Sequence, residues 1–222
     1  MTLKAFEAAQ IDENSTALNE LTAAFRQDGA VVINGIFGNT ELERFRSAAE
    51  EFSQNRRDGE PRYSPFIHIQ RERPEYAELV RDKRLVQYVE LLLGSAAEMI
   101  QAMFYYKAPG HLGFTKHQDN YYCEVKPPEA MVVAWVAIDD ADDENGCLYV
   151  YPGSQHEPIL PVRDLVDPGL GKQSSSFNER DRESIMPSSY TPRIMRVPAG
   201  GVGFMHCHCL LYTSDAADEG LG

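Results

Sequence analysis

Two residues with metal-binding side chains stand two positions apart at His117 and Asp119. The surrounding run 114–122 is predicted to be a β-strand, in which residues i and i+2 project from the same face. A neutral imidazole nitrogen and an anionic carboxylate oxygen, completed by a second histidine from a distant strand, suit Fe(II) and leave positions for oxygen chemistry. The pair alone is a weak signal, because a strand histidine equally serves as a hydrogen-bonding residue inside a fold.

A second cluster of metal-binding residue types is Cys207, His208 and Cys209. Three alternating residues on one strand do not close a tetrahedral zinc site. The sequence has 4 cysteines, which are too few for a disulfide scaffold and lack CxxC spacing. We therefore expect reduced, partly buried thiols and no zinc.

The elements that must position these side chains change character along the chain. The N-terminal part has apolar residues at helical spacing, which predicts a helix around 18–25 ended by Gly29, a strand at 31–33, a helix from Asn39 or Thr40, and a helix at 82–93. Short β-rich runs then predict strands near 99–107, 114–122, 130–138, 147–152, 192–197 and 202–207. Residues 164–191 are expected to form a long surface loop. Helices followed by short strands indicate a mainly β fold, an antiparallel barrel or jelly roll with N-terminal helices on one face.

Length and charge restrict the class of partner. A chain of 222 residues is long enough for one substantial core, so a single domain is expected. The net charge of -13 would repel phosphate backbones and anionic membranes, which disfavours nucleic acid and lipid and favours a small-molecule substrate. The sequence shows neither a secretory leader nor an apolar run of membrane-spanning length, and a cytoplasmic location is expected.

A series of short blocks in fixed order resembles the phytanoyl-CoA dioxygenase family over most of the chain. The blocks are 25–32 (FRQDGAVV), 103–107 (MFYYK), 116–122 (KHQDNYY), 133–139 (VAWVAID), 142–148 (DDENGCL) and 152–156 (PGSQH). The resemblance implies a double-stranded β-helix, which is a jelly roll. It also implies Fe(II), 2-oxoglutarate and molecular oxygen, with hydroxylation of a small organic molecule coupled to decarboxylation of 2-oxoglutarate to succinate. By the same resemblance, a retained Asp119 favours hydroxylation or desaturation over halogenation.

The resemblance also suggests residues for cosubstrate binding. Met103 and Trp135 match positions that line the 2-oxoglutarate pocket in the family, although a Met and a Trp on strands also serve as ordinary core residues. Lys107 is expected near the pocket mouth, where its ammonium group could meet a carboxylate; a solvated lysine at a strand end is the alternative.

The chain departs from the family pattern after His206. The family's second liganding histidine should fall near position 211, where this sequence has Leu211. The arginine that would pair with 2-oxoglutarate about ten residues later has no counterpart, since no Arg or Lys follows Arg196. His206 or His208 as a substitute ligand is an alternative.

The closing run 209–222 resembles no part of the family and is predicted to be a non-native tail. The expected organisation is an oxygenase domain at 1–208 with a jelly roll that is incomplete at its C-terminal end. On this interpretation the intact parent is the enzyme, and the activity of the present chain stays open. The alternatives are a non-enzymatic jelly-roll module that binds a small molecule, and a cupin-like isomerase or metal hydrolase that works without 2-oxoglutarate.

Overall fold

The computed structural model describes residues 2–12, 15–54, 65–106, 113–165 and 182–213. The helices of this part are α1 (Thr16–Asp28), α2 (Asn39–Gln54), α3 (Ile69–Glu72), α4 (Pro74–Leu79), α5 (Lys83–Leu93) and α6 (Asn120–Cys123), with short 3-10 turns at Ala8–Gln10, Pro128–Ala130 and Ser154–His156. Of the helices so described, none is long and apolar enough to cross a bilayer.

The strands are short. They are β1 (Ala5–Glu7), β2 (Ala30–Asn34), β3 (Phe66–Ile67), β4 (Met103–Phe104), β5 (His117–Gln118), β6 (Val132–Val136), β7 (Leu148–Val150), β8 (Val162–Asp164), β9 (Arg182–Ser184), β10 (Arg193–Met195), β11 (Val202–His206) and β12 (Leu210–Thr213).

Local signals in the sequence set the ends of the longer helices. The Ser15 side chain accepts a hydrogen bond from the Leu18 amide at 3.1 Å and caps α1, which ends at Gly29 in the left-handed conformation. Asp82 caps α5 in the same way, and Gly94 ends it with φ of 73°. The predicted helix boundaries at Gly29, Asp82 and Gly94 are therefore confirmed.

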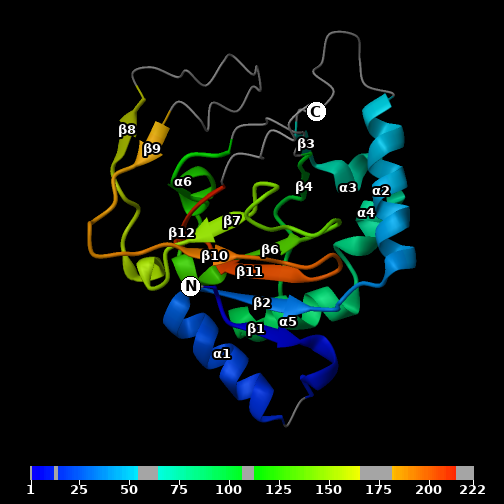
Figure 1. Cartoon of the computed structure of the whole chain (residues 1–222), viewed down its shortest axis with the longest axis horizontal. Helices are drawn as coiled ribbons and strands as arrows, with labels where there is room; N and C mark the ends of the chain where they lie inside the picture. The colour runs from blue at the N-terminus through cyan, green and yellow to red at the C-terminus, as the bar shows by residue number, and fades with distance from the viewer. Residues whose placement is uncertain (1, 13–14, 55–64, 107–112, 166–181, 214–222) are drawn as a thin grey trace.

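Two four-stranded sheets form the body of the molecule. The first has the strand order β1-β2-β11-β6 and the second the order β10-β7-β12-β5. Only β1 and β2 pair in parallel within the two sheets as described; their other pairs are antiparallel. Two further antiparallel pairs are β3 with β4, which packs on the helical side of the core, and β8 with β9, which Figure 1 shows on the side opposite α2.

The first sheet separates two apolar layers because its side chains alternate. Val31 and Phe204 belong to the cluster that includes side chains of helices α1, α2, α4 and α5. Val32 and Met205, their neighbours in sequence, belong to a second cluster shared with strands β7, β10 and β12 of the other sheet. The order of layers is therefore helices, first sheet, second sheet, which agrees with the predicted jelly roll with helices on one face.

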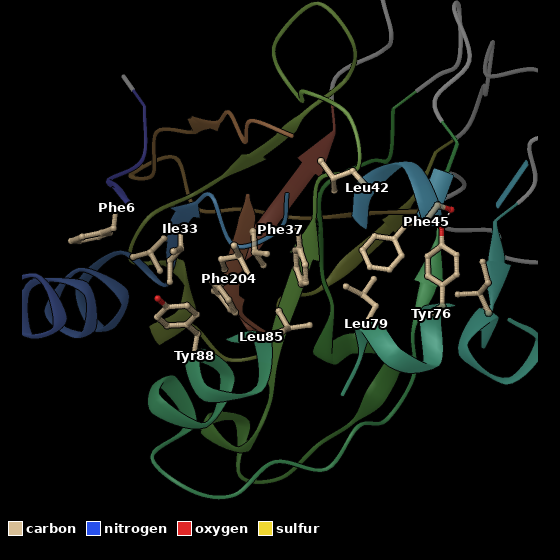
Figure 2. Packing of buried hydrophobic residues seen from close by; sticks show 14 of the residues in the cluster. Phe6, Ile33, Phe37, Leu42, Phe45, Tyr76, Leu79, Leu85, Tyr88 and Phe204 are labelled. Atoms are coloured by element: carbon tan, nitrogen blue, oxygen red, sulfur yellow. Dashed lines mark hydrogen bonds between the residues drawn. The ribbon is translucent and has the colours of Figure 1, made fainter. Parts of the chain in front are cut away.

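The helical layer packs tightly against the first sheet. Phe204 is fully buried, and its ring lies 6.0 Å from that of Tyr88 on α5, with Leu85 beside them in Figure 2. On the other side of the same cluster, the Tyr76 hydroxyl donates to the Phe45 carbonyl at 2.9 Å. These contacts hold β11, and with it the chain that leads to β12, in a fixed place.

Some of the predicted strands are wrong in extent. Of the described residues of the strand expected at 99–107, only the two residues of β4 form a strand. Of the strand expected at 114–122, only β5 does, and it ends at Gln118. The chain turns there because the Asn120 side chain accepts a hydrogen bond from the Val125 amide at 2.7 Å, which closes a turn in place of an extended strand. In the predicted loop 164–191, residues of β9 pair with β8, and 166–181 lie outside the described residues.

Candidate metal site and related proteins

His117 presents one ring nitrogen to Asp119. The other nitrogen, Nδ1, lies 2.7 Å from the Thr115 carbonyl oxygen. Because a carbonyl oxygen only accepts hydrogen bonds, Nδ1 carries a proton, and in the neutral ring the lone pair therefore lies on Nε2. Nε2 faces Asp119 Oδ1 at 3.6 Å, which is too long for a hydrogen bond. A lone pair and a carboxylate oxygen at this separation are arranged to share a cation.

Asp119 reaches this position by a route that the sequence did not predict. Its backbone has φ of -58° and ψ of -34°, so it is the helical residue before α6 and not part of a strand. The strand argument for a shared face is therefore wrong, although the two side chains do lie together. They are 13% and 26% exposed respectively, so the pair is half-enclosed and still accessible to a small ligand. Their role as metal ligands stays a prediction.

The position opposite His117 belongs to a leucine. In the antiparallel pair of β12 with β5, Leu211 is the register partner of His117. Directly opposed residues point to the same face of a sheet, with Cβ atoms roughly 5 Å apart. Leu211 is 3% exposed and packs in the core between the two sheets. The place from which a third donor would reach the ion is therefore filled by an apolar side chain.

His206 and His208 do not supply the missing donor. His208 Nδ1 donates to the Glu157 carbonyl at 3.1 Å, and its Nε2 lies 2.9 Å from Asn120 Nδ2, from which it accepts. His206 Nδ1 accepts from the His208 backbone amide at 3.1 Å. In both rings the lone pair is therefore already used within the protein. Among the described residues, no three His, Cys, Asp or Glu side chains gather as a metal site.

The cysteines beside His208 are buried thiols. Cys207 Sγ donates to the Pro128 carbonyl at 3.1 Å, and Cys209 lies near Ser154 in the core. Burial raises the pKa of each of these thiols to about 12, so both are protonated at neutral pH. The reduced, buried thiols predicted from the sequence are therefore confirmed at these two positions.

Two of the three predicted cosubstrate residues, Met103 and Trp135, lie in the part of the chain that the structure describes. Met103 Sδ accepts from the Tyr105 hydroxyl at 3.4 Å, the Tyr105 ring lies 5.4 Å from that of Phe114, and Phe114 lies 6.5 Å from the His117 ring. A chain of contacts thus connects Met103 with the candidate metal site, although no direct contact brings the two together here. The cosubstrate role of Met103 stays a prediction.

Trp135 lies on β6 opposite Gly203 and packs against the same inner cluster that contains Leu211. Trp135 therefore packs as a partly buried core residue on the side of the first sheet that faces the second sheet. Lys107 lies outside the described residues. The cosubstrate roles of both residues stay predictions.

Sequence reasoning missed several residues around His117. The Thr115 carbonyl that fixes the ring tautomer has no signature, because every residue has a carbonyl. Tyr122, whose ring lies 6.2 Å from that of His117, and Phe114 were visible only as aromatic residues near the pair. An aromatic run beside metal-binding residues was the available signal.

The donor set fits two positions of an iron site and lacks the third. A neutral nitrogen and a carboxylate oxygen are the ligands expected for Fe(II), and the Thr115 carbonyl, bonded to the other ring nitrogen, holds the imidazole in the required tautomer. The described residues complete no three-donor set.

Curated proteins similar to this chain match most of its length. The peroxisomal phytanoyl-CoA dioxygenase of Bos taurus is 25% identical over 171 residues, which are 67% of this chain and 51% of that protein. The ectoine dioxygenase of Stutzerimonas stutzeri (strain A1501) is 24% identical over 217 residues, 89% of this chain and 72% of that protein. The chain spans about half the length of the mammalian relatives it matches.

Solved structures show the same fold. The epimerase SnoN, in a crystal structure with Fe3+, alpha ketoglutarate and nogalamycin RO, has a TM-score of 0.70 at 17% identity, covering 91% of this chain and 79% of that one. The family model described as phytanoyl-CoA dioxygenase (PhyH) matches residues 25–215. The chain belongs to the phytanoyl-CoA dioxygenase family.

Proposed function

We propose that this chain carries the catalytic domain of an Fe(II)- and 2-oxoglutarate-dependent oxygenase that hydroxylates a small organic molecule. The single observation that carries the proposal is the His117 Nε2 lone pair facing Asp119 Oδ1 at 3.6 Å. Membership of the family and the iron and alpha ketoglutarate in the SnoN structure support the same chemistry. When bound, iron would supply the oxygen-activating centre, and 2-oxoglutarate would be converted to succinate.

The roles proposed for individual residues rest on the family pattern and on the contacts of His117. His117 and Asp119 would hold the metal, with Thr115 keeping the imidazole in the tautomer that leaves Nε2 for the ion. Met103, Trp135 and Lys107 are proposed to serve the 2-oxoglutarate pocket. The retained Asp119 carboxylate favours hydroxylation, because the metal then has an anionic protein ligand at the place where halide would bind.

The third position limits what the present chain does. With Leu211 opposite His117, the described residues offer two donors, and we propose that the 222-residue chain binds Fe(II) weakly and turns over little. The oxygenase domain is proposed to be 1–208 and the non-native tail 209–222. The first residues of that tail nevertheless form β12 between β5 and β7.

A cytoplasmic location also stays a prediction.

Anaerobic titration with Fe(II) and 2-oxoglutarate tests the proposal. We expect a visible metal-to-ligand charge-transfer band that needs both additions, weak in the 222-residue chain and stronger in its Leu211→His variant, which adds a third donor. On admission of air, the Leu211→His protein should form succinate. Absence of the band from both proteins at high protein concentration would count against iron and 2-oxoglutarate binding at this place.

A non-enzymatic binding module is the second candidate, and Leu211 favours it. A jelly roll whose third metal position is apolar would still enclose a small molecule without oxidising it. Oxygen uptake coupled to succinate formation by the unsubstituted 222-residue chain would exclude this candidate. Ligand binding that is unchanged by metal chelators would support it.

A further inference from the structure

The residues on either side of Asp119 are both amides, and both are buried. Gln118 is fully buried, and Asn120 is 4% exposed. Buried amides are costly unless their donors and acceptors are all paired. Two such residues flanking a candidate metal ligand therefore point to a network with a specific task.

The Asn120 side chain uses its hydrogen-bonding capacity at two places. Its Oδ1 accepts from the Val125 amide at 2.7 Å, which fixes the orientation of the group. Nδ2 then donates to the Val125 carbonyl at 3.1 Å and to His208 Nε2 at 2.9 Å. His208 is itself held by Nδ1, which donates to the Glu157 carbonyl at 3.1 Å. The His208 ring is thus a fixed acceptor for Asn120.

Gln118 joins the same segment from the other side of Asp119. Its Nε2 donates to the His208 carbonyl at 2.9 Å and to the Pro158 carbonyl at 3.2 Å, and its Oε1 accepts from the Leu160 amide at 2.8 Å. The backbone amide of Asn120 adds a bond to the Cys207 carbonyl at 3.0 Å. Three independent contacts therefore connect the segment around Asp119 with residues 207 and 208.

Residues 207 and 208 lie between β11 and β12, and β12 carries the position opposite His117. The network therefore connects the turn that presents Asp119 with the strand that faces the candidate metal. Since Asp119 has left the strand and stands in a helical turn, ladder hydrogen bonds do not hold it. Its place relative to His117 depends on the groups that anchor the residues beside it.

We infer that Asn120 and His208 form a positioning pair for the metal site, with Gln118 as a second anchor. The pair touches neither metal nor substrate; it acts through Asp119. The inference rests on the proposed function, because it assumes that Asp119 and His117 bind a metal. Partners that orient a metal ligand typically change metal affinity by about 10- to 100-fold when removed.

Co(II) serves as the probe, with its dissociation constant measured by equilibrium dialysis and its visible spectrum recorded on the same samples. Asn120→Ala is made both in the 222-residue chain and in its Leu211→His variant, and each is compared with the protein it was made from. The tighter binding expected of Leu211→His makes the change measurable. We expect Asn120→Ala to raise the Co(II) dissociation constant by about 10- to 100-fold and to change the Co(II) spectrum.

Gln155→Ala is the matched control. Gln155 is also a buried amide, but it donates to the Arg26 and Gln27 carbonyls at the end of α1. It should lower the melting temperature and leave the Co(II) dissociation constant unchanged. If Asn120→Ala and Gln155→Ala both lower the melting temperature and neither alters Co(II) binding, the network is only structural and the inference is overturned.

Substitutions of His208 give the same comparison without touching Asn120. A glutamine at this position offers an oxygen near the place of Nε2, so His208→Gln should keep most of the affinity, whereas His208→Ala should lose as much as Asn120→Ala. Equal Co(II) affinities in both variants and the parent would contradict the inference. Failure of the proposed function gives a different result. In that case the Leu211→His protein and the double variant Leu211→His/His117→Ala would bind Co(II) with the same dissociation constant.

Discussion

Leu211→His is expected to raise the affinity for Fe(II) or Co(II) by about 100-fold or more. Leu211 lies opposite His117 in the β12 and β5 pair and points to the same face. An imidazole there joins two donors that the fold already holds in place, and binding through linked groups gains about 10² or more over separate groups. Equilibrium dialysis under anaerobic conditions measures the change.

Leu210→His is the matched control for this substitution. Leu210 is also fully buried, but it pairs with Gln118, and its side chain projects from the face of β12 opposite to that of Leu211. Both variants place an imidazole in an apolar core and should lose stability. Only the one at 211 should gain metal affinity, so an equal gain at 210 would contradict the assigned register.

His117→Ala and Asp119→Ala are each expected to reduce metal affinity to the level of nonspecific binding, a loss of at least about 100-fold in the Leu211→His background. Each substitution removes a donor atom and leaves the other without its partner at 3.6 Å. Asp119 is 26% exposed, so Asp119→Ala should change the melting temperature little. The His117 ring packs near two aromatic rings, so His117→Ala should lower the melting temperature modestly. Dialysis and thermal unfolding on the same preparations measure both quantities.

His156→Ala provides the comparison for the loss of a histidine. His156 is exposed in a short 3-10 turn, and its ring contacts the Gln155 amide rather than the metal pair. This variant should bind metal like its parent. An equal loss of affinity in His156→Ala would mean that the binding measured is a property of surface histidines and not of the proposed site.

Much of the fold was predictable from the sequence because its local signals are strong. Ser15 and Asp82 are efficient caps, and Gly29 and Gly94 adopt positive φ where the helices end. The β-branched run at 31–33 and the short β-rich run near 202–207 likewise predicted the strands β2 and β11. The short strands β1, β3, β8, β9 and β12 were missed, since two to four residues carry too little pattern to separate a strand from a loop.

The candidate site was predicted in its residues but not in its geometry. His117 and Asp119 are close because two positions separate them, yet the backbone turns out of the strand at Asp119 and enters α6. That turn depends on Val125 and on residues 207 and 208, which are distant in sequence. Position 211 followed from the spacing of the resemblance, and the register of β12 with β5 agrees with it. The buried amide network has no local signature, because its partners come together only in the folded chain.

Anomalous diffraction is the most direct test of a metal shared by His117 and Asp119. Crystals of the Leu211→His protein, soaked anaerobically with Fe(II), would be measured on both sides of the iron absorption edge. We predict one peak within about 2.0–2.2 Å of His117 Nε2 and of an Asp119 carboxylate oxygen, with His117 Nδ1 still on the Thr115 carbonyl. A peak bound elsewhere, or a His117 ring turned so that Nε2 leaves Asp119, would contradict the account.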